Sequence, residues 1–336
     1  MSDIKTESTS AGRVVNNSKK DIDAIFIEKY GSKWTEYRKK WNDASKCIFQ
    51  DFPLFVRFEN QFKCNARCIM CVHGHADLRD DYRYKGYLSF NTFKKLVDEC
   101  DEHQCPSIGV SQTNEPLLDP DIIERLQYVS SKKNIIDIHF NTNASLLTED
   151  MSKKLLDTNI TRMNFSIDAY TEETYNKIRL GLNFKNVLQN IENFINLKEK
   201  MNIKLPIIRV SFLLQEVNKH ELEDFKRYWV DKADYVSIQR YVPISPFDDD
   251  RSLAISESPI SGKQRCSYPF ESLFIHGDGL VVPCASHRAK HIAVGNINNN
   301  SIYQIWHSDK MNELRLAHKN GCLKSTKLCD TCLFKG

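Results

Sequence analysis

Apolar and polar positions alternate with two different periods through the middle of the chain. Short apolar runs typical of buried strands occupy residues 53–60, 107–112, 135–140, 162–168, 206–215 and 235–242. Between them, apolar residues recur at helical spacing over 89–103, 119–131, 148–157, 170–179, 184–200 and 219–230. Strands that alternate with helices favour a parallel sheet with helical crossovers. The pattern predicts an α/β core of six units, and it fits an open sheet and a partial barrel equally well.

The segments on either side of this core follow other patterns. Residues 1–45 are predicted to be a disordered polar stretch of about 20 residues followed by an amphipathic helix with an aromatic stripe (Tyr30, Trp34, Tyr37, Trp41). The stripe could dock a partner, but packing on the protein's own body is the interpretation we favour. The core is assigned to 46–245, a polar, acidic linker to 246–262, and a cysteine-bearing segment to 263–336, with a hairpin over 272–284 that turns at 277–279.

Composition narrows the cellular setting and the partners. The 336 residues are 41% hydrophobic and carry a formal net charge of only +3, which gives no electrostatic reason to expect a nucleic-acid or membrane partner. The polar start of the chain has no signal-peptide pattern, and no apolar run approaches the roughly 20 residues that span a bilayer. We therefore expect a cytoplasmic protein, in which clustered cysteines act as metal ligands rather than as disulfides.

Three cysteines lie together at the end of the first predicted strand. Cys64, Cys68 and Cys71 are spaced C-x3-C-x2-C, with His73 and His75 close behind. Three thiolates can hold a cubane iron–sulfur cluster and leave one iron open, whereas three thiolates and one histidine can hold zinc. The loop opens an α/β domain at a strand's carboxyl end, where ligands bind, and this favours the cluster.

A second group of cysteines lies near the end of the chain. It comprises Cys266, Cys284, Cys322, Cys329 and Cys332. Four thiolates from this group fit a structural zinc or a fully ligated cluster equally well by spacing. The other three cysteines, Cys47, Cys100 and Cys105, are interpreted as small core residues.

The motifs over residues 53–242 resemble those of the radical S-adenosylmethionine (SAM) enzymes. The three-cysteine loop is followed in the family's order by SQTNEPLLDP (111–120), HFNTNASLLTED (139–150) and FSIDAYTEETYNKIR (165–179). Glu115 matches the glutamate of the family's Gly-Gly-Glu motif, which contacts the SAM amino group, while Thr113 and Asn114 replace the two glycines. Met70 stands where many members carry an aromatic residue. The resemblance implies a partial (β/α)6 TIM-like barrel.

The resemblance also implies the chemistry and further site residues. The open iron of a [4Fe-4S] cluster on Cys64, Cys68 and Cys71 would bind SAM, and one electron would cleave it to methionine and a 5′-deoxyadenosyl radical. Further SAM contacts are expected at strand ends and in the helix that follows, unless these side chains are only caps or solvated positions: Asn141, Asn143, Ser166, Asp168 and Arg179. Gln215, Gln239, Arg240 and Tyr241 are placed for substrate by position alone.

The cysteine-bearing C-terminal segment resembles the SPASM/twitch extension of the same enzymes. The resemblance rests on Cys266-x12-Gly279-x4-Cys284, on VGNINNNSIYQIW (294–306) and on the last cysteines. It implies one auxiliary [4Fe-4S] cluster, because five cysteines are too few for two. The expected ligands are Cys266, Cys284, Cys329 and Cys332, with Cys322 as the spare that could replace one of them.

An auxiliary cluster beside the substrate indicates an electron acceptor and hence the net oxidation of a C–H bond. Dehydrogenation of a sugar-like small molecule is the expected reaction. The alternatives are radical modification of a peptide, by epimerisation or crosslinking, and a zinc-stabilised interaction protein with no catalysis. The enzyme would need a flavodoxin- or ferredoxin-like reductant.

Overall fold

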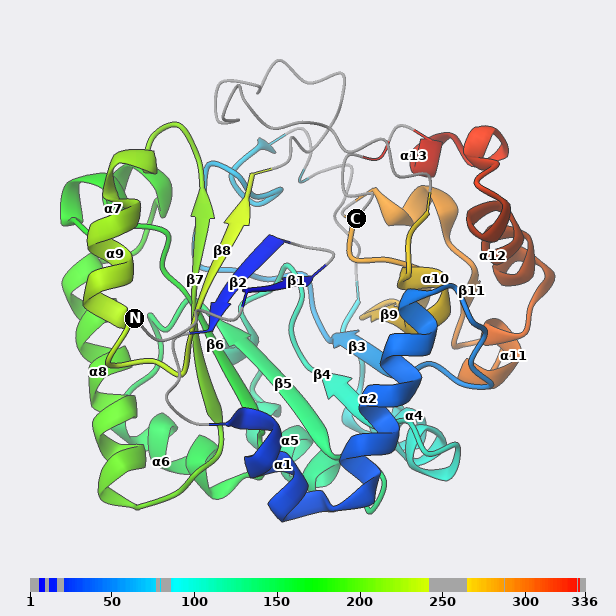
Figure 1. Ribbon diagram of the computed structural model, residues 1–336, viewed down its shortest axis with the longest axis horizontal. Helices are drawn as coiled ribbons and strands as arrows, with labels where there is room; N and C mark the ends of the chain where they lie inside the picture. Colours follow the sequence, from blue (N-terminus) through cyan, green and yellow to red (C-terminus); the bar gives the residue numbers. More distant parts are fainter. Residues whose placement is uncertain are drawn as a thin grey trace.

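The computed structural model has a core of six parallel strands (Figure 1). It describes residues 6–9, 12–16, 21–76, 79, 86–241, 265–286, 288–330 and 332. The strands are β3 (Phe55–Glu59), β4 (Ser107–Gly109), β5 (Asp137–Thr142), β6 (Arg162–Ser166), β7 (Ile207–Leu214) and β8 (Tyr235–Arg240), and each pairs in parallel with the next. All six predicted strands are confirmed.

Helices connect these strands and cover one face of the sheet. They are α4 (Phe90–Glu102), α5 (Ile122–Ser130), α6 (Glu149–Asp157), α7 (Glu172–Ile178), α8 (Phe184–Lys200) and α9 (Leu222–Trp229), with short 3-10 turns at Pro116–Leu118 and Lys219–Glu221. Ser89, Thr148, Thr171 and Asn183 each accept a hydrogen bond from a first-turn amide, which fixes where four of them begin. Thr148 thereby begins the helix that was predicted over 148–157.

Side chains alternate along the strands between an apolar face and a polar face. Val56 and Phe58 of β3 lie in the main hydrophobic core, where Phe58 packs on Phe93 of α4. The residues between and beside them, Arg57 and Glu59, point to the opposite side, toward the interior of the curved sheet. Among the described strands, β3 and β8 do not pair with each other, so the core is a partial (β/α)6 barrel with a polar interior.

The start of the chain differs from the expected disorder. Residues Thr6–Thr9 form β1 and Gly12–Asn16 form β2, and β2 pairs antiparallel with β8 at the edge of the sheet. A polar sequence can form such strands because the edge of β8 supplies the backbone hydrogen bonds. The rest of residues 1–20 lies outside the described residues.

Two helices, rather than the single predicted one, carry the aromatic stripe. They are α1 (Ile22–Tyr30) and α2 (Ser32–Ser45), and the break falls at Gly31, whose φ is +59°. Trp34 and Tyr37 are buried, and the Trp34 ring stacks on Phe26 at 4.0 Å between centroids. The stripe therefore packs on the protein's own body, at the amino ends of the barrel strands (Figure 1).

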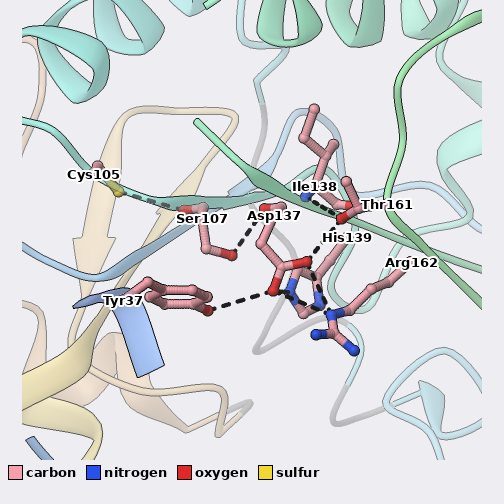
Figure 2. A network of polar contacts seen from close by, with 8 residues as sticks. All are labelled: Tyr37, Cys105, Ser107, Asp137, Ile138, His139, Thr161 and Arg162. Atoms are coloured by element: carbon pink, nitrogen blue, oxygen red, sulfur yellow. Dashed lines mark hydrogen bonds and ion pairs between the residues drawn. The ribbon is translucent and has the colours of Figure 1, made fainter. Parts of the chain in front are cut away.

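A buried polar network fixes this helical pair to the barrel (Figure 2). The Tyr37 hydroxyl approaches one carboxylate oxygen of Asp137 at 3.5 Å, and Thr161 donates to the other at 2.7 Å. The Arg162 Nε donates to both oxygens, at 2.9 and 3.1 Å. Burial by itself would raise the pKa of Asp137, but the charge of Arg162 and the contact with His139 hold it well below its usual range.

The C-terminal segment continues the sheet of the core. It contains α10 (Tyr268–Glu271), β9 (Ser272–His276), β10 (Leu280–Val282), β11 (Gly295–Asn296), α11 (Ile302–Trp306), α12 (Asp309–Asn320) and α13 (Lys327–Asp330), with 3-10 turns at Ala289–Ile292 and Leu323–Ser325. The predicted hairpin is confirmed: β9 and β10 pair antiparallel across a turn that ends at Gly279, with φ of +88°.

The C-terminal segment is joined to the core through the sheet as well as through the chain. Strand β9 pairs in parallel with β3, so the sheet runs from one part into the other without a break. The carboxylate of Glu99 on α4 accepts from the amides of Ile302 and Tyr303 and so holds the start of α11. Apolar residues such as Trp306 belong to the main core. The expected linker, 246–262, lies outside the described residues.

No helix in the part of the chain that the structure describes is long and apolar enough to cross a membrane.

Candidate active site and cluster sites

The three-cysteine loop is tied to the end of helix α7. The Arg67 amide donates to the Leu180 carbonyl at 2.8 Å, and the Ile69 amide donates to the Ile178 carbonyl at 3.1 Å. The loop is also tightly folded on itself, since a β-carbon on Gly74 would lie 2.2 Å from the Cys68 carbonyl oxygen. Residues far apart in the sequence thus fix the backbone around the predicted ligands.

The three thiols lie close enough to influence one another. Burial and the neighbouring thiols of Cys68 and Cys64 raise the pKa of Cys71 to about 12. Burial likewise raises the pKa of Cys64 to about 11. Ligand binding must therefore replace buried protons by metal, as is usual for thiolate sites. Three neighbouring thiols are a suitable donor set for a cubane cluster with one open iron.

The two histidines behind the loop have other partners. The His73 ring stacks on Phe62 at 4.3 Å between centroids, and burial together with Arg67 and Arg79 lowers its pKa to about 4. The His75 Nε2 contacts the Ile69 carbonyl oxygen at 2.5 Å. Neither geometry supports the alternative in which a histidine completes a zinc site.

Arg179 and Asp168, both predicted SAM contacts, lie beside the cluster loop and pair with each other. The Arg179 guanidinium donates to the Asp168 carboxylate, and its other terminal nitrogen lies 3.5 Å from the Cys68 sulfur. The second Asp168 oxygen accepts from the Leu213 amide at 2.7 Å. Asp168 has a φ of +65°, and the Asn218 side chain donates to its carbonyl at 2.8 Å. The pair thus joins strands β6 and β7 to the three-cysteine loop.

Glu115 is buried at the end of β4 and bridges three segments. Its carboxylate accepts from the Leu117 amide at 3.1 Å, the Thr142 hydroxyl at 2.7 Å and the Asn143 amide at 2.8 Å. Burial raises its pKa, while these hydrogen bonds act in the opposite direction. A carboxylate offers about four acceptor positions, so three internal donors leave one for a ligand amino group.

The two asparagines predicted as SAM contacts after the third strand, Asn141 and Asn143, have different hydrogen-bond partners. The Asn143 side chain donates to Asn65, between the first two loop cysteines, at 2.9 Å and so connects β5 with the cluster loop. The Asn141 amide donates to Ser111 at 3.0 Å. Asn141 and Ser166 are both half-buried and lie on the polar face of the sheet. The structure therefore brings Glu115, Asn143, Asp168 and Arg179 to one edge of the sheet, around the loop.

Sequence reasoning missed Glu59, which holds the segment that replaces the family's two glycines. Its carboxylate accepts from both the amide and the hydroxyl of Thr113, and the Asn114 side chain accepts from the Gln112 amide at 2.9 Å. Thr113 is thus engaged with the barrel interior, which explains how a side chain is accommodated there. A carboxylate at the end of the first predicted strand was the available signal.

The substrate residues predicted by position have different surroundings. Gln215 is fully buried, and its backbone amide donates to the Asn218 side chain at 2.7 Å. Tyr241 is buried and Gln239 half-buried. The side chain of Arg240 lies outside the described residues.

Four of the five C-terminal cysteines surround one cavity. Cys266, Cys284, Cys329 and Cys332 line a space of about 280 Å³, closed on the core side by Arg57 of β3. One water needs only about 10–15 Å³, so this space accommodates a polyatomic group. Burial and the neighbouring thiols of Cys329 and Cys332 raise the pKa of Cys284 to about 12. Four thiols around one cavity are a complete ligand set for a [4Fe-4S] cluster.

Cys322 does not line this cavity. It is exposed, and its sulfur approaches the Asn320 carbonyl oxygen at 3.7 Å. Within the described residues, no group of three or more His, Cys, Asp or Glu side chains is placed to hold a single metal ion. Both sites are assigned to clusters because of the thiols that they contain, three at the first site and four at the second.

Comparison with known proteins agrees with this geometry. The model of the radical SAM superfamily matches residues 61–228, which is half of the chain, and the model of the SPASM iron-sulfur cluster-binding domain matches residues 266–333. The chain therefore belongs to the radical SAM superfamily and carries a C-terminal SPASM domain. Members of this class use a [4Fe-4S] cluster and SAM, and the SPASM domain adds an auxiliary iron–sulfur cluster.

Individual relatives are distant. A tungsten-containing aldehyde ferredoxin oxidoreductase cofactor-modifying protein from Pyrococcus furiosus is 22% identical over 83% of this chain and 89% of its own length. The chain spans little more than half the length of several other curated relatives. BtrN, solved with AdoMet and 2-DOIA, aligns over 85% of this chain and 94% of its own, with a TM-score of 0.54 and 16% identity. Streptococcus suis SuiB, solved with its precursor peptide SuiA, aligns over 84% and 71%, with a TM-score of 0.65 and 12% identity.

Proposed function

We propose that this radical SAM enzyme abstracts hydrogen from a substrate C–H bond and completes a net two-electron oxidation, the dehydrogenation of a sugar-like small molecule. The observation that carries the proposal is the position of the auxiliary cysteine cavity. Arg57 of barrel strand β3 forms part of its wall. A cluster held there would lie against the barrel interior, where it could accept an electron from substrate.

The residues of the chain have separate tasks in this scheme. Cys64, Cys68 and Cys71 would hold the cluster that supplies the electron for SAM cleavage. Glu115 would accept a hydrogen bond from the SAM amino group through its remaining acceptor position. Arg179, held by Asp168, would face the SAM carboxylate. Asn141 and Ser166 would provide polar contacts to the ribose from the half-buried ends of their strands.

Electrons balance without a further oxidant. The substrate gives one hydrogen atom to the 5′-deoxyadenosyl radical, which leaves as 5′-deoxyadenosine. It then loses a proton and one electron, and Cys266, Cys284, Cys329 and Cys332 would hold the cluster that accepts that electron. A flavodoxin- or ferredoxin-like protein would provide the reducing electron at the first site.

Radical modification of a peptide is the second candidate. It is supported by the higher TM-score of SuiB in complex with its precursor peptide, compared with BtrN in complex with 2-DOIA. Transfer of deuterium to 5′-deoxyadenosine distinguishes the two: a perdeuterated sugar or aminocyclitol labels the product in the first case, and only a deuterated peptide labels it in the second.

The experiment that tests the shared core of both candidates is SAM cleavage by anaerobically reconstituted protein under dithionite. The wild type should form 5′-deoxyadenosine. The triple variant Cys64→Ala, Cys68→Ala, Cys71→Ala should retain the iron of the auxiliary site but form none. Undiminished 5′-deoxyadenosine formation by the triple variant would refute the assignment of the first cluster.

A further inference from the structure

Arg57 brings a permanent positive charge to the wall of the auxiliary cysteine cavity. It lies on barrel strand β3 and lines the same space as Cys266, Cys284, Cys329 and Cys332. Among the described residues that line this space there is no aspartate, glutamate or lysine. A buried arginine is costly unless a carboxylate, an anion or a full set of hydrogen bonds accompanies it. The charge of Arg57 therefore requires a partner.

The protein itself compensates this charge only in part. The Arg57 Nε is buried and has no hydrogen-bond partner among the described residues. Glu59, two residues further along the same strand, accepts hydrogen bonds from the amide and the hydroxyl of Thr113 instead. Burial lowers the pKa of Arg57, while Tyr268 and Glu59 act in the opposite direction without cancelling that effect.

Packing fixes the position of the Arg57 guanidinium. In the sheet, Arg57 lies between Gly109 of β4 and Phe274 of β9. The guanidinium is 4.9 Å from the Phe55 ring centroid and 5.8 Å from the Phe274 ring centroid. Gly109 makes room for it, because a β-carbon there would lie 3.2 Å from the Arg57 Nε. The side chain is thus held in place by its neighbours in the sheet.

The same neighbours connect Arg57 with the cysteine segment. Strands β3 and β9 lie side by side (Figure 1). The Phe274 ring meets the Tyr268 ring edge-on, at 5.9 Å between centroids, and Tyr268 itself lines the cavity. Phe274 and Cys284 also belong to one small apolar cluster. Ring contacts as well as the cavity wall therefore join Arg57 to the site of the four cysteines.

The two cluster sites differ in the charges around them. At the first site, Arg179 lies 3.5 Å from the Cys68 sulfur, and its charge is balanced by the ion pair with Asp168. At the auxiliary site, no described carboxylate lines the wall with Arg57. Glu271 on α10 is buried in the same segment, but it does not line the cavity, and burial raises its pKa to about 7. The auxiliary site is therefore the more electropositive of the two.

We propose that Arg57 is the counter-charge of the auxiliary cluster and raises its reduction potential. The inference rests on the proposed function, in which this cluster accepts the electron that the substrate radical loses together with a proton. A cubane held by four thiolates is anionic, and its reduction adds one more negative charge. A buried positive charge stabilises the reduced form more than the oxidised form, because charges interact strongly in an interior of low dielectric. Arg57 acts through the cluster and favours electron transfer from substrate to the auxiliary site.

The test is the midpoint potential of the auxiliary cluster, measured by a redox titration followed by electron paramagnetic resonance. The anaerobically reconstituted full chain carries Cys64→Ala, Cys68→Ala and Cys71→Ala, so that only the auxiliary cluster contributes. Adding Arg57→Gln should reduce the ratio of reduced to oxidised cluster at a fixed potential about tenfold, which is about 59 mV for one electron. Arg57→Lys, which keeps the charge, should retain most of the original potential. An unchanged potential in Arg57→Gln would overturn the proposal.

A matched control separates the cavity wall from the rest of the barrel interior. Arg209 on β7 also has a buried Nε without a hydrogen-bond partner among the described residues, but it does not line the cavity. Arg209→Gln should therefore shift the potential much less than Arg57→Gln, and equal shifts would overturn the proposal.

Iron content shows whether each variant still holds its auxiliary cluster. If Arg57→Gln loses the cluster, Arg57→Lys decides: retained iron with a potential near the original supports the role of the charge, whereas loss of iron in Arg57→Lys as well overturns it.

Substrate oxidation, measured with the first three cysteines intact, keeps this inference apart from the proposed function. A potential that depends on Arg57, in an enzyme that dehydrogenates no substrate, supports the inference and refutes the proposed function. Dehydrogenation by an enzyme whose auxiliary potential does not change in Arg57→Gln does the reverse.

Discussion

The guanidinium of Arg179 lies 3.5 Å from the sulfur of Cys68 and at the same time pairs with Asp168. One side chain at the end of α7 thus connects a predicted cluster ligand with a carboxylate that follows strand β6. Both charged groups are largely buried, and the Asp168 carboxylate also binds the Leu213 amide. Through this contact, the arrangement of α7 and β6 and the arrangement of the three-cysteine loop depend on each other.

Arg179→Met should therefore destabilise the protein and weaken SAM binding together. The substitution leaves the Asp168 carboxylate buried without its counter-ion, and breaking such a pair costs about 3–5 kcal/mol. The free energy of unfolding is measured by urea titration under anaerobic conditions, and SAM affinity is measured on the folded protein. Lys177→Met on the same helix removes only an exposed ion pair with Glu173 and should have a much smaller effect on both. Equal effects of the two variants would contradict a special role of Arg179.

Glu115→Gln tests the remaining acceptor position of the buried carboxylate. Glutamine offers one acceptor oxygen, and its amide would oppose one of the donors from Leu117, Thr142 and Asn143. A charge-assisted hydrogen bond to the SAM amino group is worth roughly 1.5–3 kcal/mol, so SAM affinity should fall about tenfold or more. Iron content should stay the same, because Glu115 is not a predicted ligand.

The control for that experiment is Thr142→Val, which removes one donor to Glu115 but leaves its charge. It should cost stability with a smaller loss of SAM affinity. If Glu115→Gln loses stability and keeps its affinity for SAM, Glu115 has only the structural role that its three internal hydrogen bonds describe.

The barrel core could be predicted because its signals are local and repeated. Each predicted strand and helix of this core is found, since apolar periodicity acts within a few residues. The C-terminal hairpin was predictable for the same reason, from Gly279 at its turn.

The features of the fold that could not be predicted depend on contacts between residues that are far apart in the sequence. Strand β9 joins β3 although more than 200 residues separate them, and no local pattern marks such a pairing. The edge of β8 gives strand structure to a polar N-terminal stretch in the same way. The resemblance already implied four ligands with Cys322 as the spare, and in the fold those four cysteines line one cavity while Cys322 is exposed outside it.

Asp137 makes the stability of the barrel depend on pH. Its folded pKa lies below the unfolded value of about 3.9, so its ionised form stabilises the protein above pH 4, and this contribution is lost as the pH falls through the folded pKa. Asp137→Asn should lower the free energy of unfolding by about 3 kcal/mol at pH 7. The difference from wild type should shrink steadily below pH 4. Asp150→Asn, which removes only an exposed pair with Lys154, should give a small difference. A large difference that does not change with pH would contradict the role of the Asp137 charge.

Iron content tests the auxiliary site independently of any substrate. We expect Cys266, Cys284, Cys329 and Cys332 to hold one [4Fe-4S] cluster in addition to the cluster at the first site. The reconstituted protein should then carry about eight irons per chain, about four in each cluster. Cys329→Ala combined with Cys332→Ala should reduce this to about four. SAM cleavage at the first site should persist, while oxidation of substrate should stop because the electron acceptor is missing. Cys322→Ala is the matched control, and it should keep all eight irons because its thiol lies outside the cavity. Loss of four irons in Cys322→Ala, or four irons with one tightly held zinc in the wild type, would show that the ligand set is wrong.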